Sequence, residues 1–397
     1  MTSVPADWVE YDFDDCLADH APARLESVPQ SSYAESGAYP VVDQGASFVA
    51  GYTDDERVVH RDDLPLIVFG DHTRCIKYVD FPFATGADGT KLIKPNESVF
   101  DPRFLYFALR NLDIPHRGYN RHYSKLRELS ITAPRAREEQ RCIAEALSRI
   151  ERRGEIETAR CAALRSLKAA TMAKLFREGL RGEPLRDTRI GPLPQSWVVE
   201  RLDGVARLFS GGTPPKQHSR FWAGPLPWLS PKDMKRSWIP DTEDHISAEA
   251  ADAFSRRVPP QTTFVAVRGM ALAKDIPVCA STIEMTFNQD VKAIVANESV
   301  DPVFLYYAIS ARRHALRSEV GTSAHGTRKL GSHSLEELAI PMPTDMSEAR
   351  EIGETMLCMD DRIERCDSVA SALRNLFGSA LEKFVTGKER LPHSSDA

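Results

Sequence analysis

The chain repeats itself, and this repetition constrains the fold more than any other feature of its 397 residues. Four segments of the first half recur in the same order in the second half: 5–9 as 194–198, 96–108 as 297–308, 126–134 as 335–343, and 143–167 as 352–376. The offset between matching residues grows from 189 at the first segment to 209 at the last, so the second copy is the longer one. Four matches in one order indicate an internal duplication.

Each copy begins with a part of mixed secondary structure. This part covers residues 1–137 in the first copy and residues 181–346 in the second, where residues 181–193 form a linker. Short β-branched runs predict strands separated by turns, at 66–70, 75–79, 263–267 and 291–295. The segments FLYFAL and FLYYAI each follow an Asp-Pro pair, in which Asp can cap a helix and Pro can occupy its first turn. The predicted fold class is therefore α+β, with two pseudo-repeated α/β bodies.

Each copy ends in a long predicted helix, residues 138–180 and 347–387, and a polar tail follows at 388–397. In the second helix ten apolar residues follow alternating steps of four and three, which is the spacing of a coiled-coil seam: Ile352, Met356, Met359, Ile363, Cys366, Ala370, Leu373, Phe377, Ala380 and Phe384. The same frame in the first helix is less apolar: Ile143, Leu147, Ile150, Gly154, Glu157, Cys161, Leu164, Lys168, Thr171 and Leu175. Because so long a helix needs a partner, we expect the two helices to pair. The alternative is that the stripe packs into a single globular core.

The charge of the chain is unevenly distributed. Its formal net charge is −6, yet residues 1–100 hold 18 acids against 7 bases, whereas residues 101–200 hold 20 bases against 13 acids. Such asymmetry can direct a polyanion to one face, and it is equally typical of a solvated helix surface. No segment has the apolar length of a membrane span, and the N-terminus has no secretory pattern. The seven cysteines form no CxxC pair, so we expect reduced thiols in the cytoplasm, with neither a zinc site nor a disulfide framework.

The sequence contains no recognisable catalytic motif. It has no phosphate-binding GxxxxGK[ST], no GxGxxG before a helix, no HExxH, and no Asn/Asp-Pro-Pro-aromatic tetrapeptide of amino-methylating enzymes. Asp71 and His72 are adjacent, but the sequence places no nucleophile beside them, so a turn cap or a DNA contact is the better interpretation. The sequence therefore predicts a binding protein rather than an enzyme.

Side chains able to contact DNA recur at matching places in the two copies. Arg, Lys, Asn, Gln, Thr and His on loops can reach phosphates or base edges. In the first copy the candidates are His72, Thr73, Arg74, Lys77, Arg121, His122, Tyr123 and Lys125. In the second copy they are Lys232, Arg268, Lys274, Asn288, Gln289, His325, Thr327, Arg328 and Lys329. Each of these residues alone is equally typical of plain surface, and it is their recurrence before the last strand of each body that favours DNA contact.

Several stretches of the chain resemble the specificity subunits of Type I restriction–modification systems. They are YPVVDQG (39–45), the segment 64–92, SGGTPP (210–215), WLSPKDM (228–234), FNQDV (287–291) and the two FLY segments. The resemblance covers nearly the whole chain. It implies two target recognition domains, each reading half of a split asymmetric DNA site, and two helical spacers that pack as an antiparallel coiled coil.

The resemblance also implies partners and cofactors. A subunit of this family is non-catalytic, binds double-stranded DNA, and holds methylating subunits (expected to be two) and restriction subunits. S-adenosylmethionine, ATP and Mg²⁺ are expected on those partners and not on this chain. Two alternatives stay open from the sequence: a reader for a related fused nuclease–methylase system, and a coiled-coil scaffold whose bodies bind protein.

Overall fold

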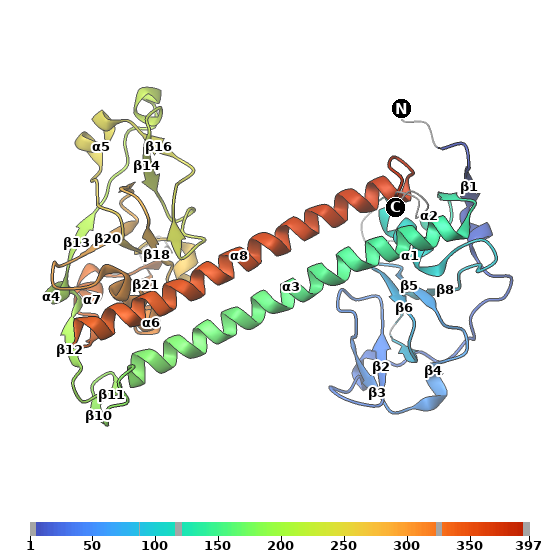
Figure 1. The fold of residues 1–397 in the computed structure, drawn as a ribbon, viewed down its shortest axis with the longest axis horizontal. Helices are drawn as coiled ribbons and strands as arrows, with labels where there is room; N and C mark the ends of the chain where they lie inside the picture. The colour runs from blue at the N-terminus through green and yellow to red at the C-terminus, as the bar shows by residue number, and fades with distance from the viewer. Residues whose placement is uncertain (1–4, 87, 116–120, 323–327, 392–397) are drawn as a thin grey trace. The chain divides into compact units, whose positions relative to one another are not determined.

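The computed structural model describes residues 5–86, 88–115, 121–322 and 328–391, which divide into two compact units (Figure 1). The first unit comprises residues 1–158 and 368–397, and the second comprises residues 159–367. Two long helices, α3 (Arg137–Glu178) and α8 (Met346–Val385), each contribute one part to each unit. Their bounds lie within two residues of the expected helical spacers. Among the described residues, no helix has the length and apolar character needed to cross a membrane.

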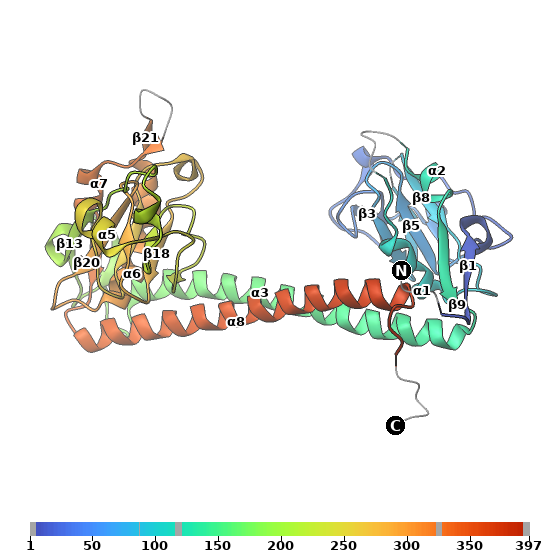
Figure 2. The ribbon, with the colours of Figure 1, turned by 90° about the horizontal axis from the view of Figure 1, so that it is seen from above.

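The first unit contains a strand pair and two small sheets. Its strands are β1 (Trp8–Asp12), β2 (Tyr39–Val42), β3 (Gly51–Thr53), β4 (Val59–His60), β5 (Leu66–Gly70), β6 (Ile76–Val79), β7 (Phe83–Thr85), β8 (Thr90–Ile93) and β9 (Ser130–Pro134). Its short helices are α1 (Pro102–Asn111) and α2 (Tyr123–Leu126). The sheet orders are β6-β5-β8 and β3-β2-β7-β4. Strand β1 pairs with β9, and the two lie side by side in Figure 2. Phe100, Phe104 and Leu105 are fully buried members of its core.

The second unit repeats this plan with additional strands. Its strands are β10 (Leu185–Thr188), β11 (Gly191–Pro194), β12 (Val198–Arg201), β13 (Ala206–Ser210), β14 (Leu226–Leu229), β15 (Trp238–Ile239), β16 (His245–Ile246), β17 (Thr263–Ala266), β18 (Val278–Ser281), β19 (Thr286–Phe287), β20 (Val291–Ala296), β21 (Gly321–Thr322), β22 (Arg328–Lys329) and β23 (Ala339–Met342). Its short helices are α4 (Leu202–Val205), α5 (Ala248–Phe254), α6 (Pro302–Ser318) and α7 (Ser332–Glu336). The main sheet has the order β13-β20-β17-β18-β15.

The structure confirms the duplication inferred from the sequence. The outer pair β1–β9 of the first unit corresponds to β12–β23 of the second, and both pairs are antiparallel. The order β8-β5-β6 corresponds to β20-β17-β18, while the parallel pair β2–β7 corresponds to β14–β19. The predicted helix starts are also confirmed, because the side chain of Asp101 caps α1 and that of Asp301 caps α6, each followed by a proline.

The predicted seam positions of both long helices are buried or half-buried, including the polar ones of the first helix. In the second unit the Lys168 ammonium of α3 forms an ion pair with Asp360 of α8. Asp360 also accepts hydrogen bonds from the Ser237 hydroxyl (3.1 Å) and the Tyr307 hydroxyl (2.6 Å). A lysine at a seam position is therefore compensated by a carboxylate of the facing helix. Within each unit α3 and α8 lie side by side and run antiparallel, as a coiled coil (Figures 1 and 2).

One expectation about the cysteines is wrong. Cys161 and Cys366 form a disulfide whose Cα atoms are 5.7 Å apart, so not all seven thiols are reduced in this structure. The heptad frame placed both cysteines at seam positions, and helices that face each other through such positions bring these residues together. Cys16, Cys75, Cys142, Cys279 and Cys358 are free. No group of residues suited to bind a metal ion occurs in the part of the chain that the structure describes.

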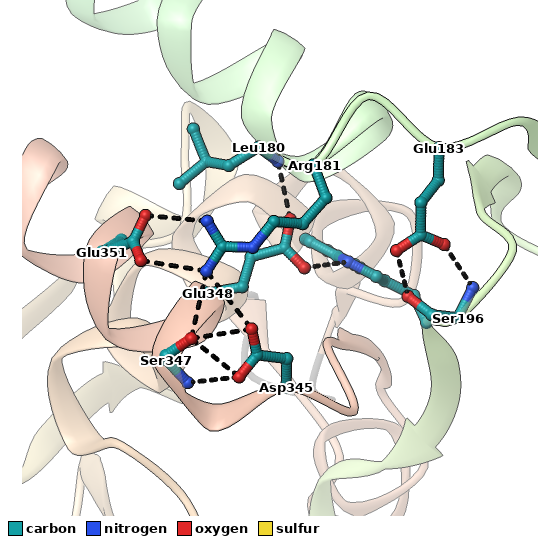
Figure 3. A network of polar contacts seen from close by, with 9 residues as sticks. Leu180, Arg181, Glu183, Ser196, Asp345, Ser347, Glu348 and Glu351 are labelled. Atoms are coloured by element: carbon teal, nitrogen blue, oxygen red, sulfur yellow. Dashed lines mark hydrogen bonds and ion pairs between the residues drawn. The ribbon is translucent and has the colours of Figure 1, made fainter.

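A buried carboxylate joins the end of α3 to the start of α8 in the second unit (Figure 3). Glu348 is 1% exposed, and it accepts hydrogen bonds from the Leu180 amide (2.6 Å) and the Trp197 indole (3.0 Å). Gly179 ends the helix at φ +64°, where a Cβ would lie 2.7 Å from a Glu348 carboxylate oxygen. Glycine is therefore required at this helix end both by its backbone angle and by the space available.

An arginine beyond each helix end binds the start of the other long helix. In the second unit Arg181 pairs with Glu351 (2.9 Å) and Asp345 (3.2 Å), as Figure 3 shows. In the first unit Arg390 pairs with Glu139 (2.8 Å) and with Asp7. The end of α3 thus contacts the body of the second unit at the start of α8, and the end of α8 contacts the body of the first unit at the start of α3. The same kind of joint therefore occurs in both units.

Candidate nucleic-acid interface

Asp71 holds two of the predicted loops of the first unit together. It follows β5, is 2% exposed, and accepts a hydrogen bond from the Tyr123 amide at 2.8 Å through its carboxylate. Its backbone carbonyl accepts a hydrogen bond from the His122 amide at 2.9 Å. The structure therefore brings the loop of residues 70–75 and the loop that leads into α2 to one place.

A third loop completes this cluster in the first unit. The Gln44 side chain accepts a hydrogen bond from the His72 amide (3.2 Å) and donates one to the Asp88 carbonyl (2.7 Å). The Thr73 hydroxyl donates to the Gln44 carbonyl at 2.5 Å. A Cβ on Gly70 would lie 2.2 Å from the Thr73 hydroxyl oxygen, so glycine lets the loops pack this closely. We refer to residues 44–47, 70–75 and 121–125 as the first loop cluster.

The predicted residues of the first cluster differ in exposure. Thr73 and Arg121 are exposed. His72 and Tyr123 are half-buried. Arg74 is half-buried too; it has a positive φ of 62° and donates to the Ile114 carbonyl (2.8 Å). Lys125 is half-buried and pairs with Glu128 at 2.6 Å.

Two residues of the first unit need correction as surface contacts. Lys77 is 5% exposed, and its ammonium donates to the carbonyls of Asp43 (2.7 Å) and Ser47 (2.5 Å). Burial lowers the pKa of Lys77, and the nearby Asp43 carboxylate opposes that shift. His122 is 2% exposed, and its Nδ1 lies 2.9 Å from the Asp71 carbonyl. Both side chains support the loops from inside and are not presented to a ligand.

The second unit brings together its corresponding loops in the same way. The Leu330 amide donates to the Val267 carbonyl (2.9 Å), and the Gly269 amide donates to the Arg328 carbonyl (3.1 Å). Exposed Arg268 pairs with Asp290 at 3.4 Å. The segment after β17 and the strand β22 therefore meet, as the segment after β5 and the start of α2 do in the first unit. We refer to residues 267–275, 288–290 and 328–329 as the second loop cluster.

The predicted residues of the second unit also differ in how exposed their side chains are. Lys274, Gln289 and Lys329 are exposed, and Arg328 is half-buried with its guanidinium donating to the Thr322 hydroxyl (2.8 Å). Asn288 needs correction, because it is 6% exposed and its side-chain oxygen accepts from the Asp290 amide at 3.0 Å. It shapes the turn instead of facing a ligand. The residues His325 and Thr327 lie outside the described part of the chain.

Lys232 lies on the turn after β14, beside acidic residues. Its ammonium pairs with Asp244 (2.9 Å) and Glu243 (3.1 Å), and these hydrogen bonds raise the pKa of Lys232. Since β14 pairs in parallel with β19, this turn is near Asn288, but two carboxylates already balance its charge. A phosphate would have to compete with both carboxylates for this lysine.

Three contributors to the clusters were missed by the sequence interpretation. Gln44 joins loops of the first cluster, Thr213 donates to the Gln289 side chain, and Met270 is 70% exposed beside Arg268. Gln44 and Thr213 lie in YPVVDQG and SGGTPP, so the motifs contained the signal without showing which loop each side chain would contact. An exposed methionine carries no signal in the sequence alone.

Comparison with known proteins shows which proteins this chain is similar to. The model of the "Type I restriction modification DNA specificity domain" family matches residues 194–367. The chain is 25% identical over 341 residues to the Type I restriction enzyme EcoR124I/EcoR124II specificity subunit of Escherichia coli, covering 83% of this chain and 81% of that protein. It is also 25% identical over 187 residues to the MjaIX specificity subunit of Methanocaldococcus jannaschii, covering 45% of this chain and 41% of that protein.

Solved structures show the same fold. A Type I restriction–modification S subunit from M. genitalium superimposes with a TM-score of 0.69 at 16% identity and covers 97% of both chains. A chain from a structure described as the basis of complex assembly and conformational transition of the Type I system has a TM-score of 0.52, also at 16% identity, and covers 98% of this chain and all of that one. Neither alternative left open by the sequence is favoured by these matches. Residues 194–367 thus match the Type I restriction modification DNA specificity domain, and nearly the whole chain is similar in sequence and fold to specificity subunits of Type I restriction–modification systems.

Proposed function

We propose that this chain reads a bipartite, asymmetric DNA sequence, one half-site through each loop cluster. The observation that supports this proposal is the equivalence of the clusters: in both units a late loop is hydrogen-bonded to the segment after the central strand of a sheet. Each cluster presents exposed cationic or polar side chains, Thr73 and Arg121 in one and Arg268, Gln289 and Lys329 in the other. Such groups suit phosphate and base-edge contacts.

The antiparallel helices suit the role of a spacer between the two readers. Both long helices end against a body through the same kind of joint, a positive-φ glycine followed by an arginine. A split target then has half-sites at a constant separation, because a helical spacer does not change length with DNA sequence. This expectation is specific to a two-body reader, since a single-body reader has an unsplit target.

The proposal extends to the partners. Within the restriction–modification complex, this chain would position two subunits that methylate adenine and recruit restriction subunits. It would bind neither S-adenosylmethionine nor ATP nor Mg²⁺ itself, and it would perform no chemistry. We place the complex in the cytoplasm, where the DNA that it modifies is found.

The experiment is to express the chain with its methylating partners and to map the methylated adenines on a random DNA pool by single-molecule sequencing. The expected product is one motif with two defined half-sites separated by a constant number of undefined bases. Omission of this chain is the control and should abolish sequence-specific methylation. An unsplit motif, or the same motif without this chain, contradicts the proposal.

A further inference from the structure

A large cavity lies beside α3 in the first unit. Its volume is about 720 Å³, and it is lined by aromatic side chains of the body, including Tyr78, Phe81 and Tyr106, and by charged side chains of α3. Cavities of a few hundred Å³ commonly bind ligands. The body side of the lining is aromatic, whereas the α3 side is charged: it carries the carboxylates of Glu145, Glu151 and Glu155 and the guanidinium groups of Arg141, Arg149 and Arg152. We call this cavity the α1–α3 groove.

The second unit fills the corresponding place with its own chain. Trp238 packs on Tyr306, with ring centroids 5.2 Å apart, and its indole donates to the Tyr307 hydroxyl at 3.2 Å. Next to it, the Ser237 hydroxyl donates to Asp360 of α8 (3.1 Å). Preceding both, Arg236 pairs with Glu364 of α8 (3.0 Å). Residues 236–238, in which an aromatic residue follows a basic residue by two positions, thus contact both α6 and α8.

The two places correspond residue by residue in the duplicated sequence. Tyr306 and Tyr307 of α6 correspond to Tyr106 and Phe107 of α1, at the offset of 200. On the long helices, at the offset of 209, Asp360 corresponds to Glu151 and Glu364 corresponds to Glu155, and both residues of α3 line the groove. The groove therefore presents aromatic residues and carboxylates that correspond to those contacted by residues 236–238 in the second unit.

The sheets show the same difference. In the second unit β15, which begins at Trp238, pairs in parallel with the outer side of β18. The corresponding strand of the first unit is β6, and no described strand pairs with its outer side. Tyr78 of β6 stands where β18 has Ala280, so the floor of the groove is more aromatic than its counterpart. A sheet edge beside an aromatic pocket is a common acceptor for an extended peptide.

Two polar groups of the groove have no partner within the part of the chain that the structure describes. Glu155 has no ion pair among the described residues, whereas its counterpart Glu364 is paired with Arg236. The buried Ser148 hydroxyl, which lines the same groove, has no hydrogen-bond partner in the described structure. Glu151, in contrast, is already paired with Arg110. The available carboxylate is therefore the one whose counterpart binds an arginine.

We propose that the α1–α3 groove binds an extended segment of a partner protein in which an aromatic residue follows a basic residue by two positions. The aromatic side chain packs against Tyr78, Tyr106 and Phe81, and the basic side chain pairs with Glu155. The second unit supplies this segment from within its own chain, so within the described residues the place is filled in the second unit and open in the first. This inference concerns assembly with protein and does not depend on which DNA sequence is read.

The test uses a peptide of this chain's own residues 235–240, Lys-Arg-Ser-Trp-Ile-Pro, labelled with a fluorophore and titrated with the full-length chain in a fluorescence anisotropy assay. We expect saturable binding at one site. Replacing Trp238 of the peptide by Ala should weaken it at least about tenfold, because a buried aromatic anchor dominates such interfaces. Glu155→Lys in the protein should weaken it about three- to tenfold, the effect of exchanging an ion pair for a repulsion.

A charge swap and a matched control variant distinguish binding in the α1–α3 groove from binding elsewhere on the chain. The peptide with Arg236→Glu should bind Glu155→Lys better than it binds the unmodified chain. The matched variant Glu364→Lys, in the filled place of the second unit, should leave peptide affinity unchanged. Absence of saturable binding overturns the proposal, as does sensitivity to Glu364→Lys in place of Glu155→Lys. If sedimentation shows a dimer of the chain that Glu155→Lys dissociates, the occupant is a second copy and the proposed partner protein is refuted.

Discussion

Replacing Glu348 by Ala should destabilise the second unit strongly, because this carboxylate is the acceptor for two buried donors. The Leu180 amide and the Trp197 indole both donate to it, at 2.6 and 3.0 Å, and Glu348 itself is 1% exposed. Each donor left without a partner costs about 1–3 kcal/mol. The carboxylate also lies in the first turn of α8, where a negative charge stabilises the helix by about 0.3–1 kcal/mol. The expected loss in the free energy of unfolding is therefore about 2–7 kcal/mol, the two donors and the helix term together.

The measurement is urea denaturation followed by circular dichroism, together with hydrogen exchange of the amides around Leu180. Glu348→Gln should lose less than Glu348→Ala, because an amide oxygen can still accept from one of the two donors. Glu354→Ala is the matched control: it removes an exposed glutamate of the same helix and should change the free energy by no more than about 0.5 kcal/mol. If Glu348→Ala behaves like this control, or if exchange at Leu180 is unchanged, the joint does not hold the helix end as described.

Three further predictions follow from buried groups. Asp71→Ala should lower the free energy of unfolding by about 1–3 kcal/mol and speed hydrogen exchange of the Tyr123 amide, because that buried amide loses its acceptor. Asp71→Asn keeps an acceptor oxygen and should retain most of the protection. Equal exchange rates in the two variants would contradict the role of Asp71 in joining the loops. Burial lowers the pKa of His60, so the unfolded state binds a proton more readily than the folded state. As the pH falls from 7 to 5, the free energy of unfolding should therefore decrease more steeply in the unmodified chain than in His60→Gln. Parallel curves of free energy against pH would refute this prediction. A reductant should lower stability by about 2–4 kcal/mol through loss of the disulfide of Cys161, and full alkylation of that thiol without reductant would contradict it.

The features that the sequence could predict are those set by local spacing. The ten seam positions of each long helix follow from a period of 3.5 residues, and the structure buries or half-buries all of them, even Glu157 and Lys168. The Asp-Pro helix starts and the strand β5 (Leu66–Gly70) follow from caps and β-branched runs in the same way. Such features depend on neighbours in the chain, so they do not require knowledge of the tertiary packing.

Two errors could have been avoided by applying the same periods more strictly. Side chains of a strand alternate between its faces, so Lys77 shares a face with Val79, which is fully buried. That pattern indicates an interior lysine. In the same way, Cys161 and Cys366 both occupied seam positions of helices expected to pair, and this pattern permits a disulfide. Both predictions were wrong because they relied on the residue type and not on the position of the residue within its strand or helix.

The loop clusters could be predicted only in part. The sequence indicated that the late loop of each copy occupies an equivalent place, but the contact of Asp71 with Tyr123 joins residues 52 positions apart. The Gln44 contact with the His72 amide spans 28 positions. No local pattern encodes such distances, because they depend on how the sheets pack. The α1–α3 groove was missed for the same reason, since it is visible only when the two units are compared in three dimensions.

The central claim, that each loop cluster reads its own half of a split DNA site, is tested most directly by changing one cluster at a time. Arg121→Ala alters an exposed residue of the first cluster, and Lys329→Ala alters an exposed residue of the second. Methylated motifs are mapped by single-molecule sequencing for the complex assembled with each variant. We predict that each substitution relaxes or weakens recognition in one half-site only, a different half for each, and leaves the spacing between them unchanged. A change in both halves from either single substitution, or an altered spacing, would contradict the claim.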